Sequence, residues 1–298
     1  TQLTVKKGIG QVFLILDNVS IDNSSSYTSP IYIKKNNQVY LSLAPNSTNT
    51  LIGPSIYYDN VDSDYDCDST IFSKSDLTIN GTGTLSVTDT ANDGIVSKDS
   101  LKITGGEISV NAENQGLRGN DFLGICGSPT ITVHSTDHAL RSKGEINISE
   151  TPTIITNTTN GDGIHCSYDY TYDASNGFSV SQVPNTGLIN ISGGTVNVTS
   201  YADGIQADGD ITVTGGTLQV TNKYDSTKSS ADSHKSIKNA TTITTEQVEV
   251  DLADALDTED SDNDGDTTEL RPGVSFDSSS NTYYAAATYS ATAKGTIT

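Results

Sequence analysis

A tripeptide that returns at a nearly constant interval is the feature that most constrains the fold of this chain. In each copy a small residue precedes an aliphatic one, as in Asp93-Gly94-Ile95, Gln115-Gly116-Leu117, His138-Ala139-Leu140, Asp162-Gly163-Ile164 and Asp203-Gly204-Ile205. The aliphatic residues Ile71, Ile95, Leu117, Leu140 and Ile164 are spaced 24, 22, 23 and 24 apart. A fixed period of this length is typical of stacked repeats.

Each repeat contains two or three short runs in which apolar and polar residues alternate, and no segment has helical spacing. Strands that return every 22 to 24 residues bury their apolar side by stacking at about 4.8 Å. We therefore expect an all-β parallel β-helix of about nine coils, from Ile31 to Leu256. A β-sandwich lacks such self-similarity, and propeller blades run about 40 to 45 residues.

Longer intervals locate insertions in the repeat. Ile205 follows Ile164 by 41 residues, which is one coil plus a loop over about 167–187, and Ile31 precedes Ile71 by 40. We expect a β-helix domain over 1–258 with insertions at about 53–68 and 167–187. An acidic loop over 259–270 and a strand-like tail over 271–298 follow it.

Composition excludes several functions. The formal charge is −21, which excludes a nucleic-acid binder working through a basic patch. The longest apolar run, residues 12–16, is too short to cross a bilayer. The chain starts at Thr1 rather than Met, and we expect a processed, extracellular protein, secreted or on the cell surface. Its three cysteines cannot all pair within one chain, so we expect buried free thiols.

Two columns of the repeat carry charged side chains. The residue after the aliphatic position is Arg118, Arg141 and His165 in three successive coils. Two positions before the aliphatic residue, the acidic column includes Asp93, Asp162, Asp203 and Asp254. The two columns either neutralise each other or form a groove in which Arg118, Arg141 and His165 hold carboxylate or hydroxyl groups of an extended polymer.

The acidic residues predict calcium as a cofactor. Carboxylates alternate through the acidic loop, where Gly265 permits a sharp turn; the candidate ligands are Asp260, Asp262, Asp264, Asp266 and Glu269. Position twelve of that loop is Arg271 instead of Glu, and no helices flank it. A solvated acidic linker is the alternative. Asp93, Asp162 and Asp203 form a second, sparser candidate set.

Aromatic residues alternate in the second insertion, which predicts three phenol rings on one strand face: Tyr168, Tyr170 and Tyr172. Such rings either stack on sugar faces or pack the insertion onto its coil. Nine N-x-Ser/Thr sequons, against about six expected by chance, also allow glycosylation.

The repeats resemble the secreted carbohydrate-binding β-helix family of bacteria, whose shape is that of the pectate lyases. The resemblance is carried by residues 72–85 and 92–99 and by the later Asp-Gly-Ile motifs, and it covers about residues 10–222. It implies a right-handed β-helix, calcium, and acidic plant polysaccharide as ligand without established catalysis. Asp93, Asp162 and Asp203 match the family's motif and would share its structural or calcium role. Gln115-Gly116 and His138-Ala139 depart from it.

Three functions follow as hypotheses. The first is non-catalytic binding of an acidic, pectin-like polysaccharide, with calcium bridging two negatively charged partners. In the second, the chain is a subunit of an extracellular filament that grows by end-to-end stacking or by strand addition from the tail. The third is a polysaccharide lyase in which Arg118 or Arg141 removes a proton.

Overall fold

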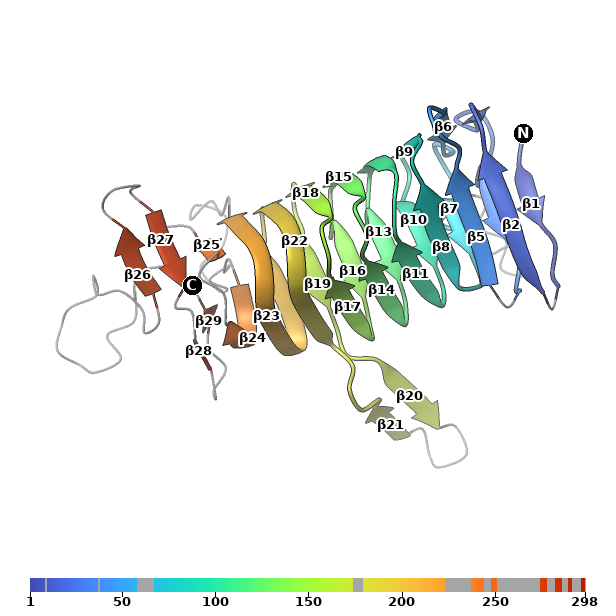
Figure 1. Cartoon of the computed structure of the whole chain (residues 1–298). Helices are drawn as coiled ribbons and strands as arrows, with labels where there is room; N and C mark the ends of the chain where they lie inside the picture. Colours follow the sequence, from blue (N-terminus) through green and yellow to red (C-terminus); the bar gives the residue numbers. More distant parts are fainter. Residues whose placement is uncertain are drawn as a thin grey trace.

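The computed structural model is an all-β solenoid whose strands stack along one axis (Figure 1). It describes residues 1–8, 10–36, 38–57, 67–173, 179–222, 237–243, 248–250, 274–277, 282–285, 289–290 and 296–297. Strands of successive coils pair in parallel throughout the solenoid. The predicted parallel β-helix is confirmed.

The repeated aliphatic position forms one continuous column along the axis. Its members pair in register in the order Leu3, Ile31, Ile71, Ile95, Leu117, Leu140, Ile164, Ile205 and Ile237. The described coils therefore number nine, and they start one coil earlier than Ile31. Leu256, where we expected the last coil, lies outside the described residues.

Each full coil contributes a strand to each of three sides. The first side contains β1 (Leu3–Val5), β4 (Ile31–Ile33), β7 (Ser69–Ser73), β10 (Asp93–Ser97), β13 (Leu117–Gly119), β16 (Leu140–Ser142), β19 (Ile164–Cys166), the start of β23 (Ile205–Asn222) and β24 (Ile237–Ile243). The second side contains β2 (Gln11–Leu16), β5 (Gln38–Leu43), β8 (Leu77–Gly81), β11 (Ser100–Ile103), β14 (Phe122–Ile125), β17 (Glu145–Ile148) and the start of β22 (Leu188–Ser200). The third side contains β3 (Ser20–Asp22), β6 (Thr48–Ile52), β9 (Thr84–Asp89), β12 (Glu107–Ala112), β15 (Thr130–Ser135), β18 (Thr153–Thr158) and β25 (Val248–Val250). In the later coils, β22 and β23 continue through a corner onto the third side.

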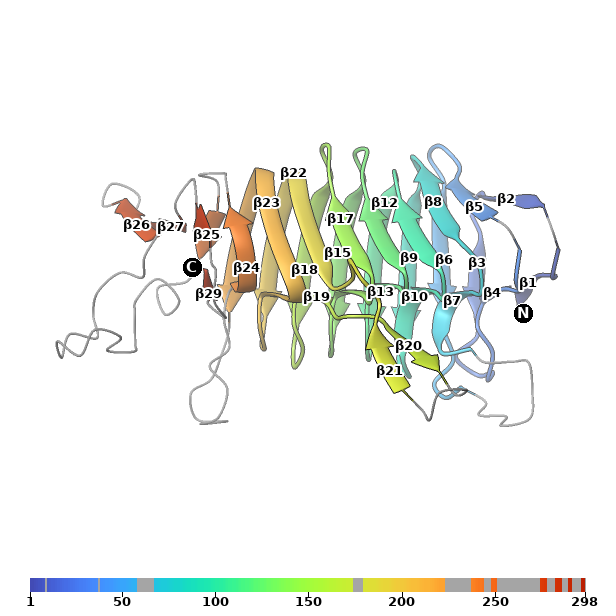
Figure 2. The ribbon, with the colours of Figure 1, turned by 90° about the horizontal axis from the view of Figure 1, so that it is seen from below.

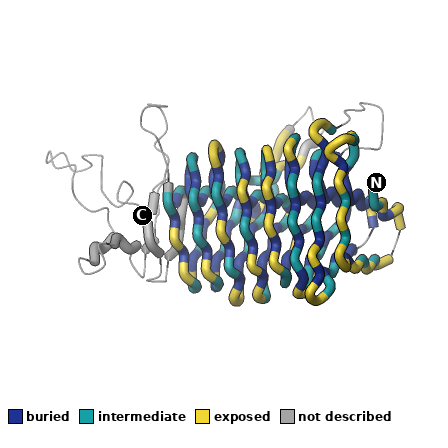
Figure 3. The backbone as a smooth tube through the Cα atoms, turned by 90° about the horizontal axis from the view of Figure 1, so that it is seen from above, coloured by how far each residue is buried: buried dark blue, intermediate teal, exposed yellow. Residues whose placement is uncertain are grey.

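The core is a set of aliphatic ladders inside the coils. Along β12, Ile108 and Val110 are buried whereas Glu107, Ser109 and Asn111 point to solvent. The same alternation recurs from coil to coil, so buried and exposed stretches line up along the tube (Figure 3). Full burial of each such aliphatic side chain contributes about 1.5–3 kcal/mol, which explains why a chain with only 33% apolar residues folds.

The small residue before each aliphatic residue lies at a tight corner, as expected. A Cβ on Gly116 would approach Val133 Cγ1 to 2.2 Å and the carbonyl oxygen of Ala139 to 2.7 Å. Neither distance is compatible with a side chain larger than hydrogen unless the next coil moves. The corner therefore requires glycine at this level of the stack.

The second insertion is a β-hairpin on the outside of the tube. Its strands β20 (Tyr170–Asp173) and β21 (Ser179–Gln182) pair antiparallel, separately from the main sheet. The amide of Val183 donates to the carbonyl of Asp169 at 2.9 Å and closes the base of the hairpin. The hairpin projects away from the coils in both side views (Figures 1 and 2).

The tail forms strands, as predicted, and these pair with the chain's own last coil. They are β26 (Val274–Asp277), β27 (Thr282–Ala285), β28 (Tyr289–Ser290) and β29 (Thr296–Ile297). β28 and β29 pair antiparallel with β24, and β27 pairs antiparallel with β25. The tail thus adds its strands to the end of its own solenoid.

The cysteines are free thiols: Cys67 and Cys166 are buried, and Cys126 is half-buried. Burial raises the pKa of the Cys166 thiol to about 12, so it stays protonated at neutral pH. Within the described ranges, no helix is long and apolar enough to cross a membrane.

Candidate functional site

The basic column lies on the first side of the coils, as the repeat predicts. Arg118 pairs with Arg141, and Arg141 with His165, at successive central positions of β13, β16 and β19. In these strands the two flanking residues are buried and the central residue is half-buried. Alternation along a short strand therefore directs the charged side chains outward.

Most of the acidic column neutralises the basic column. Arg118 Nη1 lies 2.9 Å from Asp93 Oδ2, and its Nη2 lies 2.9 Å from Asp68 Oδ2. Lys238 Nζ lies 2.9 Å from Asp203 Oδ2. The first of the two interpretations of the columns is thus correct for Arg118. Its guanidinium is engaged by two carboxylates and is only 18% exposed.

Asp93 is the most deeply buried of these carboxylates, with 1% of its side chain exposed. Burial raises its pKa to about 6, although Arg118 and the amide of Gln115 act to lower it. Oδ1 accepts hydrogen bonds from the Gln115 amide and from Asn114 Nδ2. Asp93 thus joins two neighbouring coils at the corner.

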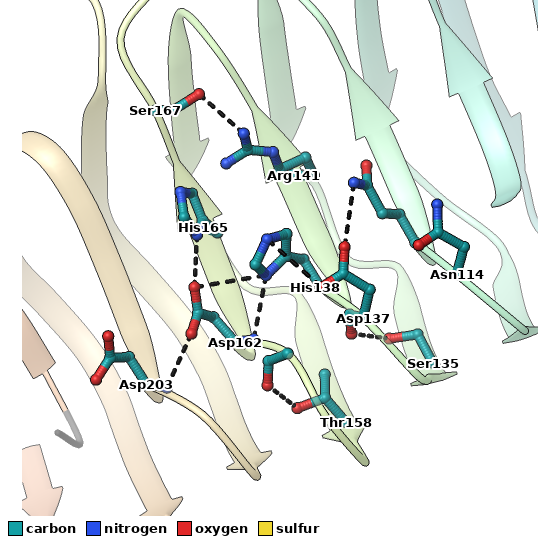
Figure 4. Close-up of polar contacts among 12 residues, drawn as sticks. Asn114, Ser135, Asp137, His138, Arg141, Thr158, Asp162, His165, Ser167 and Asp203 are labelled. Atoms are coloured by element: carbon teal, nitrogen blue, oxygen red, sulfur yellow. Dashed lines mark hydrogen bonds and ion pairs between the residues drawn. The ribbon is translucent and has the colours of Figure 1, made fainter. Parts of the chain in front are cut away.

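Asp162 has two imidazole partners instead of a permanent cation (Figure 4). Asp162 Oδ2 lies 2.5 Å from His165 Nδ1 and 3.5 Å from His138 Nδ1. Burial and the neighbouring His165 lower the pKa of His138 to about 4, so its ring is neutral near pH 7. The pKa of Asp162 lies below its ordinary value because its hydrogen bond with His165 and the two imidazoles outweigh burial, which acts to raise it.

His138 was not among the residues expected at a site, although its tripeptide was recognised. It occupies the same position of the repeat as Asp93 and Asp162. A histidine in the column that carries Asp93, Asp162 and Asp203, one coil before an aspartate, was the signal that could have identified this pair.

A surface hollow of about 190 Å³ lies beside the basic column, and we call it the cationic hollow. Its basic side chains are those of Lys98, Arg118, Arg141 and Lys143, and Gln115, Asn120 and Ser142 complete its lining. Lys98 and Lys143 each lie three positions after the aliphatic residue of their coil. They belong to a third charged column, which was not among the two columns predicted from the sequence. Reading every position of the repeat across coils would have revealed it.

The basic groups of the cationic hollow are not equally neutralised. Arg118 and Lys98 share Asp68. Arg141 and Lys143, by contrast, make no ion pair within 4 Å to any described residue. Arg141 Nη2 donates to Ser167 Oγ at 2.9 Å, while its buried Nη1 has no hydrogen-bond partner among the described residues. Burial lowers the pKa of Arg141 below its ordinary value.

The tyrosines of the insertion do not form one flat row. Tyr168 lies before the strand, and its ring meets that of Tyr170 edge-on, with centroids 6.4 Å apart and planes at 87°. Tyr170 is 55% exposed, and only the backbone of Tyr172 is described. β20 begins only at Tyr170, so Tyr168 lies outside the strand, and the expected arrangement of three rings on one face stays a prediction.

The hairpin begins and ends next to the cationic hollow. Ser167, just before it, accepts the hydrogen bond from Arg141, and the amide of Gly187, just after it, donates to the Lys143 carbonyl at 3.3 Å. An exposed aromatic ring is thereby attached beside a group of cations. Such a combination can contact both the ring faces and the acidic substituents of a sugar polymer.

The predicted calcium ligands divide into two groups. Asp260, Asp262, Asp264, Asp266 and Glu269 lie outside the described residues. Asp93, Asp162 and Asp203 belong to three different coils, and each has basic or imidazole partners. Asp162 and Asp203 do lie in contact, since the Asp203 amide donates to Asp162 Oδ1 at 2.8 Å.

Two known proteins are similar to this chain. A carbohydrate-binding domain-containing protein of Acetivibrio thermocellus is 40% identical over 107 residues, which are 35% of this chain and 37% of the relative. The chain thus matches little more than a third of that relative's length. A solved structure, a gadolinium derivative of the polysaccharide lyase-like protein from C. thermocellum, is 26% identical, with a TM-score of 0.54. The similarity covers 76% of this chain and 75% of that one.

A family profile gives the more extensive match. The family described as carbohydrate-binding domain-containing protein matches residues 1–129 and 126–274. These two segments span most of the solenoid and include the basic column, the cationic hollow and the hairpin. The chain therefore belongs to the family of carbohydrate-binding domain-containing proteins.

Proposed function

We propose that the chain binds an acidic, pectin-like polysaccharide at the cationic hollow, with the hairpin as a second contact. The observation that carries this proposal is the pair Arg141 and Lys143, which are basic and without an ion-pair partner among the described residues. In a protein of net charge −21, this pair makes the surface hollow locally basic. It provides the attraction that an acidic polymer needs.

The guanidinium of Arg141 suits a carboxylate ligand. Its planar fork can donate two parallel hydrogen bonds to one carboxylate, whereas a neutral sugar offers no matching acceptor pair. Nη1 is buried without a partner in the described chain, and a buried unpaired donor costs about 1–3 kcal/mol. A uronate carboxylate can accept from Nη1 only after the side chain shifts and exposes that atom, and the new hydrogen bond would then recover the free energy.

Calcium dependence and an extracellular location are part of the same proposal. Calcium dependence rests on the sequence of the acidic loop, where hard oxygen ligands alternate from Asp260 to Asp266. The extracellular location rests on the resemblance of the repeats to a secreted family. The cationic hollow attracts a polyuronate without a bridging ion. Calcium would therefore act away from the hollow, where carboxylates of the chain and of the polymer repel each other.

Binding to a panel of polymers tests the proposal. Gel retardation and calorimetry with polygalacturonate, its methyl ester and a neutral glucan should rank the three in that order. Arg141→Gln and Lys143→Gln should each weaken polygalacturonate binding at least tenfold. Lys7→Gln, which removes an exposed lysine of the first coil, is the matched control. Equal binding by all variants would show that the hollow is not the site.

The same assay with and without a chelator tests calcium. We expect chelation to weaken binding, and Asp262→Asn combined with Asp264→Asn to reproduce that loss in the presence of calcium. Binding that is identical in chelator would contradict a calcium bridge. It would leave the hollow as the sole electrostatic contact.

A lyase is the second candidate function, and the lowered pKa of Arg141 favours it. Proton abstraction by arginine requires a guanidinium that loses its proton more readily than usual, and burial moves Arg141 in that direction. Arg118 is a poorer base because Asp68 and Asp93 stabilise its charged form. Rising ultraviolet absorbance from an unsaturated product, absent in Arg141→Gln, would establish the lyase over simple binding.

A filament is the third candidate, and the described pairing of the first coil favours it. β2 pairs with β5 on one edge and has no described partner on the other, and its Phe13 and Ile15 are 66% and 71% exposed. The tail, however, already pairs with its own last coil. Negative-stain microscopy at high concentration should show filaments if coils stack between molecules, and monomers if they do not.

A further inference from the structure

The strongest unassigned feature is a group of three side chains at the corner of two adjacent coils. His138 precedes β16, whereas Asp162 and His165 lie just before and within β19. One potential ligand atom from each of the three lies within 4.8 Å of the others. In Figure 4 dashed lines join the Asp162 carboxylate to both imidazole rings.

We propose that His138, Asp162 and His165 form a binding site for a divalent transition-metal ion, with Zn²⁺ as the best match. Two imidazole nitrogens and one carboxylate oxygen are ligands that zinc accepts, whereas Ca²⁺ takes oxygen ligands. Three protein ligands leave a fourth position for water or a substrate group. The three side chains are 17%, 6% and 13% exposed, so the site is sheltered but reachable from solvent.

One distance among the ligand atoms already suits a zinc ion, and a second must widen. Ligands at about 2.0–2.1 Å from a tetrahedral ion lie roughly 3.3 Å apart. His138 Nδ1 lies 3.5 Å from Asp162 Oδ2. The 2.5 Å separation of His165 Nδ1 from the same oxygen is that of a hydrogen bond, and the ion replaces the shared proton as the pair widens. The hydrogen bond from the Asp162 amide to His138 Nδ1, at 3.1 Å, is lost in exchange.

The surroundings of the three residues resemble the outer shell of known metal sites. His138 Nε2 lies 3.6 Å from Asp137 Oδ1, so a carboxylate faces the ring nitrogen opposite the proposed ligand atom. Asp162 Oδ1 accepts the Asp203 amide at 2.8 Å, which fixes the orientation of the carboxylate. Carboxylates behind ligand histidines and hydrogen bonds to ligand carboxylates orient a site and strengthen its affinity for metal.

The other described aspartates of the acidic column show why, among the described coils, the site occurs at this level. Asp93 is paired with Arg118 and Asp203 with Lys238, which are permanent cations that exclude a metal ion. Asp162 is paired with imidazoles, which can exchange a proton for a metal. Asp137 and Asp203 add negative charge nearby, against the single Arg141.

Titration of the full chain with metal alone tests the proposal, without glycan and therefore independently of the proposed function. After chelation and desalting, calorimetry with Zn²⁺ should show binding that His138→Gln and His165→Gln each weaken at least tenfold. His134→Gln removes an exposed histidine from β15 and is the matched control, with affinity unchanged. Co²⁺ should give visible absorption bands of a four-coordinate ion in the wild type and lose them in both site variants.

A measurement on the wild type keeps the test decisive if a variant fails to fold. With ¹⁵N-labelled histidine, Zn²⁺ should shift the ring resonances of His138 and His165 and leave those of His134 in place. The proposal is overturned if Zn²⁺ leaves the His138 and His165 resonances unmoved. It is also overturned if folded variants bind Zn²⁺ within twofold of the wild type.

Discussion

At the residue scale, burial distinguishes two kinds of charged side chain at the corners. Asp93, Asp162 and Asp203 are nearly inaccessible, and each accepts hydrogen bonds or ion pairs from the next coil or the one after it. Exposed ion pairs are worth little, but a buried carboxylate that loses its partner is costly. These aspartates therefore connect coils, whereas Arg141 and Lys143 of the hollow make no ion pair with a described residue.

Removing the partner of Asp93 should be strongly destabilising. Arg118→Met leaves a buried carboxylate with no guanidinium, and we expect the free energy of unfolding at pH 7 to fall by about 3–5 kcal/mol. Urea denaturation measures the loss. In the double variant Asp93→Asn/Arg118→Met, at least half of it should return, and a double variant as unstable as the single one would contradict the pairing.

Asp93 should also give stability a distinctive pH dependence. Its pKa is about 6 in the folded chain, against 3.8 for an ordinary aspartate, so the folded state binds its proton first as the pH falls. Its contribution to stability is therefore fully present below about pH 3.8 and is lost as the pH rises through 6. Over pH 4 to 7 this amounts to about 3 kcal/mol at most.

Comparison with Asp93→Asn isolates this contribution, because asparagine does not titrate. Urea denaturation at intervals from pH 4 to 7 should show the wild type losing stability relative to the variant as the pH rises. A constant difference across that window would mean that the carboxyl titrates at its ordinary value.

At the element scale, the strands and their columns could be predicted because each coil repeats the same inward positions. The register of Ile95, Leu117 and Leu140 follows from their spacing alone. The partners of the columns could not be predicted in this way. Which cation reaches Asp93, and whether Arg141 stays unpaired, depends on side-chain directions at corners, where Asp68 comes from two coils away.

The cationic hollow and the hairpin show the same limit. Lys98 and Lys143 were present in the repeat, but a hollow requires the curvature of the corner, which spacing does not give. The alternating tyrosines indicated a strand, yet that strand begins at Tyr170 and leaves Tyr168 outside it. Alternation predicts the face of a residue only once the ends of the strand are known.

The corner glycines should tolerate no side chain. Gly116→Ala places a Cβ against Val133 Cγ1 and the backbone of Ala139, and we expect a loss of about 1–3 kcal/mol in thermal or urea unfolding. Gly10→Ala is the matched control, because its Cβ would meet no atom within 4 Å. Equal effects of the two substitutions would contradict the close approach of the coils.

The hairpin should be dispensable for folding but not for binding. Replacing residues 170–182 with Asn-Gly retains Asp169 and Val183, whose hydrogen bond closes the base. Tyr170 and Val180 are exposed, so the melting temperature should change by no more than about 2 °C. Polygalacturonate binding should weaken several-fold in the same variant. Unaltered binding would remove the hairpin from the proposed surface.

At the scale of the whole molecule, the net charge of −21 acts against both folding and the approach of an acidic polymer. Like charges lie along the full length of the tube, and the exposed cations are too few to cancel them. The cationic hollow is thus a local feature within a repulsive field. Its effect on a ligand depends on how far that field extends through the solvent.

Salt should therefore act in opposite directions on stability and on binding. Raising NaCl from 10 to 100 mM shortens the screening length from about 30 to 10 Å, which weakens self-repulsion. We expect the melting temperature to rise by about 2–4 °C, equivalent to about 1 kcal/mol. Polygalacturonate binding at the hollow should weaken. Choline chloride as a second salt controls for specific ions, and a falling melting temperature would contradict the expectation.

The continuous column from Leu3 to Ile237 has a consequence for how such a chain can be shortened or extended. Ile95, Leu117 and Leu140 occupy equivalent positions in successive coils. Excising residues 117–139 would therefore stack Leu140 directly on Ile95 and keep the aliphatic columns of the core continuous. Lys98 and Lys143 would then become neighbours, and Arg118 would be gone. Whole coils are thus interchangeable units. A protein of this kind can gain, lose or reorder surface side chains one coil at a time while its core keeps the same packing.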